Sequence, residues 1–318
     1  PGAGGTGNFV NPFMLSWCHP FRHMEYKVLM SAAGITDADH ADEQYVERLV
    51  SLTRNIENHG KYCLLALDKT YSRNGEVDLE KTTFYVSNEY AFSVAETYPD
   101  VFEPAMSIHP YRKDALAEME KFAKRGGRLI KWLPNGMGID PADPLCEAFY
   151  DKMKELGLIL LTHAGEEKAV EAATQDLGNP LHLRAVLDRG VRVIVAHCAS
   201  LGEDEDLDAP GKPLVASFQL FIRLMEVKKY EGLLFGDTSA MTLANRCGTG
   251  ALETLLRRTD LHARLVNGSD YPLPAANVLL RTGKLESLGF ITAGEREILN
   301  EIYDYNPLLF DFMVKRLV

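Results

Sequence analysis

Short apolar runs recur at regular intervals along this chain. Seven of them are rich in Val, Ile and Leu and are each bounded by Gly, Pro or a polar cluster, which is typical of strands buried on both faces of a parallel sheet. The runs cover residues 61–68, 102–110, 128–134, 158–165, 191–200, 232–240 and 264–272. We therefore predict parallel strands at these seven places.

Helical patterns fill the intervals between these runs. Residues 112–127 and 180–190 carry apolar positions at helical spacing, and residues 143–157 begin with an N-cap candidate, Asp143, followed by Pro144. Strand and helix alternate at intervals of about 30 to 40 residues, which indicates consecutive parallel βαβ units. The acidic stretch 202–213 interrupts this order, and we expect it to be a solvated loop.

The number of strands points to a particular α/β fold, the (β/α)8 TIM barrel, which needs eight strands where seven are visible. A helix-like stretch, 42–60, precedes the first visible strand, and residues 1–38 hold no suitable apolar run. We therefore expect the first barrel strand to lie upstream of Pro1. The prediction is a single domain over 1–318, with N-terminal loops and a helix over 1–60, barrel strands over 61–275 and C-terminal helices over 276–318.

Composition and charge narrow the possible partners. The net charge of -11 argues against binding to nucleic acid or to an anionic membrane surface. No apolar run approaches the roughly 20 residues needed to span a bilayer, and no export signal is visible. The five cysteines are scattered without a C-x-x-C pair, as in a reducing compartment. We expect a cytoplasmic protein that acts on a small molecule, with the terminal segments shaping its pocket or a homo-oligomer interface.

The opening sequence contains a glycine motif. Residues 2–7, GAGGTG, match the dinucleotide-binding pattern G-x-G-x-x-G. That pattern works only between a strand and a helix, whereas here only Pro1 precedes it and Pro12 stands where the helix would have to run. We interpret the motif as a glycine loop and keep a dinucleotide-dependent oxidoreductase as an alternative.

The ends of the predicted strands carry the candidate chemistry. In a barrel the carboxyl ends of the strands converge on one mouth. A single His at such a place is more often structural, but two from consecutive strands with a later Asp make a ligand set for Zn²⁺ that leaves room for water. The side chains at these ends are His109, Lys131, His163, His197, Asp237 and Asp270.

Three of these segments, LTHAGEE, IVAHCAS and NGSDYPLP, resemble the amidohydrolase superfamily of metal-dependent TIM-barrel enzymes. The closer likeness is to its amidohydrolase-related branch, which also contains aminocarboxymuconate-semialdehyde decarboxylase. In that family the first strand ends in an H-x-H metal pair, followed by His on strands five and six and Asp on strand eight. Counting an unseen first strand places His163, His197 and Asp270 at those positions.

The sequence departs from the family at the first strand. None of its nine histidines forms an H-x-H pair, and HPFRH places His19 and His23 four residues apart instead. We expect the pair just upstream of Pro1, with the glycine motif as the loop that leaves that strand. Without the pair, the chain would be a barrel that has lost catalysis and serves as a binding or scaffold protein.

The resemblance implies roles for the strand-end residues. His163 is a metal ligand, Asp270 binds metal and accepts a proton from the attacking water, and His197 completes a second metal position or orients the substrate. Lys131 stands where some members carry a carboxylated Lys that bridges two metals. Its alternative is an ammonium group paired with Asp237 or a substrate carboxylate.

A second group of residues lies where a substrate-binding loop is expected. The segment SIHPYR contains His109 and Arg112, and the Arg112 guanidinium could clamp an anionic group.

These residues together indicate a hydrolase that depends on a divalent metal, most simply one or two Zn²⁺ ions. The metal lowers the pKa of a bound water toward about 7, and the water attacks an amide, lactone or ester-like carbon. A nonhydrolytic decarboxylase needs the same ligands and is the runner-up.

Overall fold

The structure is a computed structural model that describes residues 6–12, 20–167, 174–276 and 279–318. The chain divides into two compact units. The sheet unit is built mainly from Gly7–Asn11 and Tyr62–Asp237, and the helical unit mainly from Pro12–Lys61 and Thr238–Val318. The single domain expected from the sequence stays a prediction. Residues 2–5 of the glycine motif, together with Cys18 and His19, lie outside the described residues.

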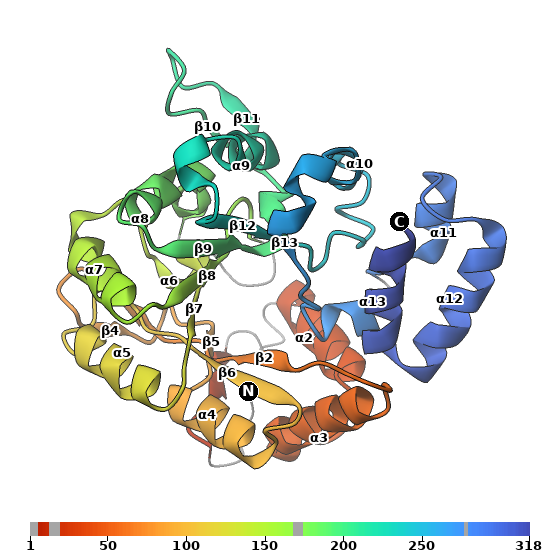
Figure 1. Ribbon diagram of the computed structural model, residues 1–318. Helices are drawn as coiled ribbons and strands as arrows, with labels where there is room; N and C mark the ends of the chain where they lie inside the picture. Colours follow the sequence, from red (N-terminus) through yellow and green to blue (C-terminus); the bar gives the residue numbers. More distant parts are fainter. Residues whose placement is uncertain (1–5, 13–19, 168–173, 277–278) are drawn as a thin grey trace. The chain divides into compact units, whose positions relative to one another are not determined.

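A curled parallel sheet forms the core of the sheet unit (Figure 1). Its strands are hydrogen-bonded in the order β12-β9-β8-β7-β6-β2. Every strand falls inside one of the apolar runs, so these predicted strands are confirmed. Their bounds are β2 Tyr62–Leu65, β6 Phe102–Met106, β7 Leu129–Trp132, β8 Ile159–Thr162, β9 Arg192–Val195 and β12 Leu234–Asp237.

Side-chain alternation fixes the two faces of this sheet. In β7, Ile130 and Trp132 are fully buried. The Trp132 ring packs on Phe149 and Tyr150 of helix α7 (Glu147–Glu155), with ring centroids 5.2 and 5.9 Å away. Neighbouring side chains in a strand point to opposite faces, so Lys131 lies on the face away from that helix.

Helices cover the outer face of the sheet (Figure 1). The cap predicted at Asp143 is confirmed, but it begins the 3-10 turn that precedes helix α7: the Asp143 side chain accepts a hydrogen bond from the Leu145 backbone, and Pro144 takes the first position of that turn. The helices of this unit are α4 Asn88–Thr97, α5 Ala115–Lys124, α6 Pro134–Met137, α7 Glu147–Glu155, α8 Arg184–Asp188 and α9 Ser217–Met225. Its 3-10 turns are η2 Pro144–Cys146, η3 Gln175–Gly178, η4 Pro180–Leu183, η5 Ala196–Ala199 and η6 Lys228–Tyr230.

The sheet unit also contains short antiparallel pairs of strands. They are β1 Phe9–Val10 with β5 Phe84–Tyr85, β3 Thr70–Tyr71 with β4 Val77–Asp78, and β10 Glu203–Glu205 with β11 Leu214–Ala216. The last pair corrects the expectation of a loop over 202–213, because its first residues form a strand. The reason is alternation: Asp204 is buried, whereas Glu203 and Glu205 on either side of it are exposed.

The helical unit combines the two ends of the chain. The Asn306 side chain donates to the Leu52 carbonyl at 2.7 Å, and the Tyr45 hydroxyl donates to the Tyr271 carbonyl at 3.2 Å. Its helices are α2 Pro20–Ala32, α3 Ala41–Arg54, α10 Ala251–Arg257, α11 Thr282–Ser287, α12 Ala293–Tyr305 and α13 Pro307–Leu317. It also contains the strand β13 Leu265–Val266, inside the seventh predicted run, and the turns η1 Ala38–His40, η7 Thr259–Arg264 and η8 Leu273–Ala275.

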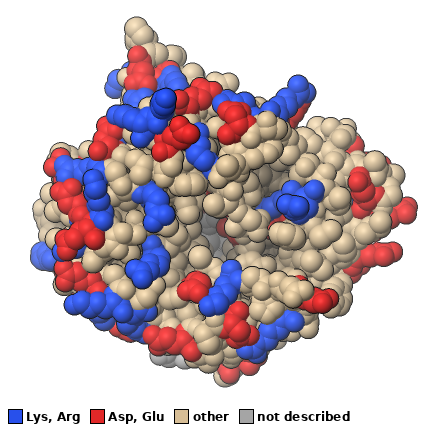
Figure 2. Space-filling model, in the orientation of Figure 1, with Lys and Arg blue, Asp and Glu red and all other residues tan. Residues whose placement is uncertain are grey.

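Charged side chains of both signs are interspersed over the face of the molecule in Figure 2. Many of them pair on the surface, as Arg125 does with Glu89 and Glu96 at 2.5 and 2.9 Å. None of the described helices combines the length and apolarity needed to cross a membrane. No disulfide joins the described cysteines, which are Cys63, Cys146, Cys198 and Cys247.

Candidate active site

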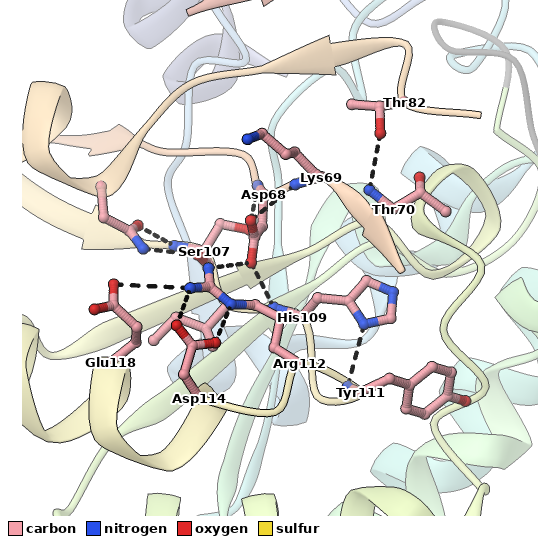
Figure 3. Close-up of polar contacts among 12 residues, drawn as sticks. Asp68, Lys69, Thr70, Thr82, Ser107, His109, Tyr111, Arg112, Asp114 and Glu118 are labelled. Carbon is pink, nitrogen blue, oxygen red and sulfur yellow. Dashed lines mark hydrogen bonds and ion pairs between the residues drawn. The ribbon is translucent and has the colours of Figure 1, made fainter. Parts of the chain in front are cut away.

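Two groups of polar residues stand at the carboxyl ends of the strands in the sheet unit. The first, the Asp68 cluster, consists of Asp68, His109, Arg112 and Asp114 (Figure 3). Asp68 follows β2 and accepts hydrogen bonds from the His109 backbone at 2.8 Å and from Arg112 Nη1 at 3.0 Å. Burial raises the pKa of the Asp68 carboxyl, while the neighbouring Arg112 charge acts in the opposite direction. Asp68 thus ties the end of β2 to the loop after β6.

The Arg112 guanidinium is the positive centre of the Asp68 cluster. Besides Asp68 it pairs with Asp114 at 2.8 Å, and it lies over the Tyr71 ring at 5.6 Å. Burial works to lower the pKa of Arg112, but the bond to Asp114 and the charge of Asp68 outweigh this, so the pKa lies above its ordinary value. A substrate anion would have to compete with these carboxylates, and the expected clamp stays a prediction.

His109 is fixed by the main chain. Its ring is fully buried, Nε2 lies 3.0 Å from the Met137 carbonyl oxygen, and Nδ1 lies 3.2 Å from the Tyr111 backbone nitrogen. These partners assign the proton to Nε2, which donates to the carbonyl, while Nδ1 accepts. Burial lowers the pKa of His109 from 6.5 to about 4. His109 is therefore a neutral support for its loop, and its expected part in substrate binding stays a prediction.

The second group, the His163 cluster, consists of His163, His197 and Glu167. His163 directly follows β8, and His197 comes two residues after β9 ends at Val195. These strands are adjacent and parallel, with Thr162 paired to Val195. The two imidazoles accordingly meet edge to face, with ring centroids 5.6 Å apart. The structure thus brings together the two histidines that the sequence placed on consecutive strands.

The backbone at His197 is unusual. His197, Cys198 and Ala199 all have positive φ, at 53°, 51° and 50°. Left-handed conformations at residues other than Gly cost on the order of 1–3 kcal/mol each and cluster at functional sites. Two contacts brace the turn: the Ser200 backbone donates to the His197 carbonyl at 3.0 Å, and the Cys198 thiol lies 3.4 Å from the Asp237 carbonyl. The turn holds His197 close to the end of the sheet.

Glu167 joins the cluster from the loop that follows β8. Its Oε2 lies 3.3 Å from His163 Nε2, and the two side chains are only 8% and 4% exposed. Gly165, between them, has φ of 80°, and a Cβ there would lie 2.5 Å from the Leu201 carbonyl oxygen, so the loop requires glycine. Sequence reasoning quoted this segment but assigned Glu167 no role, although it lies four residues after His163.

The remaining predicted residues are placed as follows. Lys131 lies in β7, and Asp237 is the last residue of β12 and is 8% exposed. Asp270 belongs to the helical unit, where it follows β13 with φ of 54°. The metal-bridging role of Lys131 and the base role of Asp270 stay predictions. Asp68 was missed although it ends the first apolar run, where the other strand-end residues were sought.

The donor chemistry matches part of a metal site. His163 and His197 offer imidazole nitrogens and Glu167 a carboxylate, which are the ligand types that Zn²⁺ accepts. Across the described part of the chain, however, no three His, Cys, Asp or Glu side chains are grouped so as to hold a metal ion. The described residues therefore supply a partial donor set.

Comparison with known proteins identifies the class to which this fold and site belong. A curled parallel sheet with helices on its outer face is typical of a TIM-barrel-like α/β protein. A sequence profile of the amidohydrolase family matches residues 64–308, and the chain belongs to that family. This confirms the resemblance seen in the sequence. No curated protein matches the chain.

The chain is similar to several solved structures. An uncharacterized TIM-barrel protein from Bordetella bronchiseptica is 18% identical, with 90% of this chain and 93% of that chain covered and a TM-score of 0.54. A putative 2-pyrone-4,6-dicarboxylic acid hydrolase from Pseudomonas putida is 18% identical over 66% and 72% of the two chains, with a TM-score of 0.44. A 5-carboxyvanillate decarboxylase from Novosphingobium aromaticivorans is 12% identical over 89% and 88%, with a TM-score of 0.47. The first of these supports a TIM-barrel-like fold, whereas the upstream strand of a complete (β/α)8 barrel stays a prediction.

Proposed function

We propose that this chain is a hydrolase of the amidohydrolase type that acts on an amide, lactone or ester-like carbon of a small molecule. The observation that supports the proposal most strongly is the pair of imidazoles, His163 and His197, whose ring centroids lie 5.6 Å apart at the ends of adjacent strands. Membership in the amidohydrolase family gives this pair its chemical context.

The proposed site depends on a divalent cation, most simply Zn²⁺. His163 would be a nitrogen ligand and Asp270 the carboxylate ligand that the family pattern implies, while His197 would either complete a second metal position or orient the substrate. When bound, the cation supplies an activated water at neutral pH.

The residues of the chain handle orientation and protons. An imidazole that holds no metal can donate or accept a proton, so in the second of these roles His197, held by its left-handed turn, is suited to protonate a leaving group or to polarise a substrate carbonyl. The low exposure of His163 and Glu167 limits the access of bulk water to that side of the site.

The proposal is tested with panels of lactones, esters and anilides, and in parallel with aromatic carboxylates, in water enriched in oxygen-18. We expect a hydrolysis product that carries one labelled oxygen. His197→Asn should lower kcat/KM by about 10²- to 10⁴-fold if it manages the proton. The matched control is His182→Asn, because His182 is not part of the His163 cluster. It lies in the turn η4 and contacts Asp140 at 3.2 Å.

Two outcomes would replace the proposal. Release of CO₂ without labelled oxygen in the product would favour the nonhydrolytic decarboxylase. No turnover of any compound, together with no zinc by mass spectrometry after metal addition, would favour a binding or scaffold protein.

A further inference from the structure

We propose that Glu167 is a positioning residue that fixes the His163 imidazole with its proton on Nε2, so that Nδ1 carries the lone pair offered to the site. The inference rests on the proposed function only in taking His163 as a site residue. Its direct support is the 3.3 Å contact between Glu167 Oε2 and His163 Nε2, made by two side chains that are 8% and 4% exposed.

The backbone of Glu167 is held on both sides by a single amide side chain. Gln175 Oε1 accepts from the Glu167 backbone nitrogen at 3.0 Å, and Gln175 Nε2 donates to the Glu167 carbonyl at 2.9 Å. Both main-chain polar groups of Glu167 are therefore used by one partner. This pair of hydrogen bonds fixes the position from which the carboxylate reaches His163.

A buried asparagine fixes Gln175 in turn. Asn135, which is fully buried, donates from Nδ2 to Gln175 Oε1 at 3.0 Å, to the Gln175 carbonyl at 3.1 Å and to the Gly165 carbonyl at 3.1 Å. A Cβ at Gly178 would lie 2.5 Å from both Asn135 Nδ2 and the Gly165 carbonyl oxygen, so close packing continues on that side. The support of Glu167 thus extends from the loop after β8 to helix α6.

This arrangement has a chemical consequence for His163. A neutral imidazole carries its proton on one of two nitrogens, and a carboxylate beside Nε2 selects the form in which Nε2 is the donor. A carboxylate that accepts from one nitrogen of a histidine also makes the other nitrogen a better base or ligand, and losing such a partner costs about 10- to 100-fold in metal affinity or activity. Glu167 is suited to positioning His163 because the hydrogen bonds to Gln175 already fix its backbone. Its carboxylate therefore does not have to become ordered when substrate binds.

The test uses nitrogen-15 NMR of the metal-free full chain labelled in its histidines, at one pH near 7.5. The His163 signals are identified by their loss in His163→Gln. We expect the native protein to show the form protonated at Nε2, and Glu167→Ala to show a mixture of both forms. An unchanged His163 signal in a folded Glu167→Ala protein would overturn the proposal.

A second measurement follows zinc itself. The dissociation constant of Zn²⁺, measured by competition with a chromophoric chelator, should rise about 10- to 100-fold in Glu167→Ala. Glu166→Ala is the matched control and should leave both the NMR signal and the constant unchanged. A Glu166 effect as large as that of Glu167 would mean that the loop, rather than the carboxylate, is responsible.

Gln175→Ala is a further variant that remains informative if Glu167→Ala fails to fold. It frees the backbone of Glu167 but keeps the carboxylate, so we expect a smaller shift toward the mixed form. No shift at all in a folded Gln175→Ala protein would contradict the role of the clamp. These spectra need neither substrate nor metal, so an inactive protein that still shows the shift would count against the hydrolase and leave the role of Glu167 intact.

Discussion

The Asp68 cluster and the His163 cluster show two uses of the same residue type. His109 and His163 each come shortly after a strand of one parallel sheet, and both are buried. The main chain fixes His109, through the Met137 carbonyl and the Tyr111 backbone nitrogen. His163 instead faces the Glu167 carboxylate and the His197 imidazole. A histidine held by backbone groups is part of the framework, whereas one held by ionisable side chains is available for chemistry.

The largest effect expected from this comparison concerns activity. His163→Gln should lower kcat/KM by about 10²- to 10⁴-fold, because its ring serves the site. His109→Gln should instead lower the thermal midpoint while leaving kcat/KM nearly unchanged, because a buried ring in contact with Tyr71 and Tyr111 is lost. Kinetics and thermal melts on both variants check this. An equal loss of activity in the two would contradict the division into a structural His109 and a functional His163.

The next effect concerns the ion pair at the centre of the Asp68 cluster. Asp68→Ala leaves the Arg112 guanidinium without its buried partner, and removing one member of a buried pair costs about 3–5 kcal/mol. Urea unfolding of the variant gives this change in the free energy of unfolding. A loss below about 1 kcal/mol would show that solvent or Asp114 replaces Asp68 as the partner of Arg112. Asp68 would then not be needed to tie the end of β2 to the loop after β6.

The contribution of His109 to the stability of the folded chain depends on pH. Burial lowers the pKa of His109 in the folded chain to about 4, below its ordinary value of 6.5. The unfolded chain therefore binds the extra proton between these values, and the contribution of His109 to stability is lost as the pH falls from 6.5 to about 4. The loss is on the order of 3 kcal/mol, by the conversion of about 1.4 kcal/mol for each pKa unit.

This contribution is isolated by measuring the free energy of unfolding of the native chain and of His109→Gln from pH 7 to pH 4. The native chain should lose more stability than the variant over this range. The raised pKa of Asp68 acts with the opposite sign, but it is present in both proteins and largely cancels in the difference. Parallel curves for the two proteins would contradict the pKa assigned to His109.

The smallest effect concerns the outer partner of Arg112. Asp114 is 58% exposed, so Asp114→Ala should cost less than about 1 kcal/mol in spite of its short contact with the guanidinium. Urea unfolding measures it alongside Asp68→Ala. A cost as large as that of Asp68→Ala would mean that burial is not what sets the strength of this pair.

The strands of this protein could be predicted from its sequence because strands buried on both faces leave an unbroken apolar run. The cap at Asp143 could be predicted for a similar reason, since its signal is local. Roles at the site could not be predicted in this way. His109 and His163 have the same local setting, and what separates them is a carbonyl from Met137 in one case and a carboxylate from Glu167 in the other.

The two clusters also show which features of the sequence were visible but given no role. Asp68 ended a predicted strand and was passed over because its partner, Arg112, lies 44 residues further along the chain. Glu167 lay within a quoted motif, but its importance depends on the contacts of Gln175 and Asn135, which no local pattern reveals. The left-handed turn at His197 could not be predicted, because its residues include no glycine.

The helical unit has a consequence for how this protein is made. Its hydrogen bond from Asn306 to Leu52 joins residues 254 positions apart in the chain, whereas strands β2 to β12 of the sheet unit lie in one continuous stretch. During synthesis at about 5–20 residues per second, helix α3 leaves the ribosome long before its partners exist. The parallel sheet can thus assemble during translation, whereas the contact between α3 and Asn306 forms only once nearly the whole chain has been made.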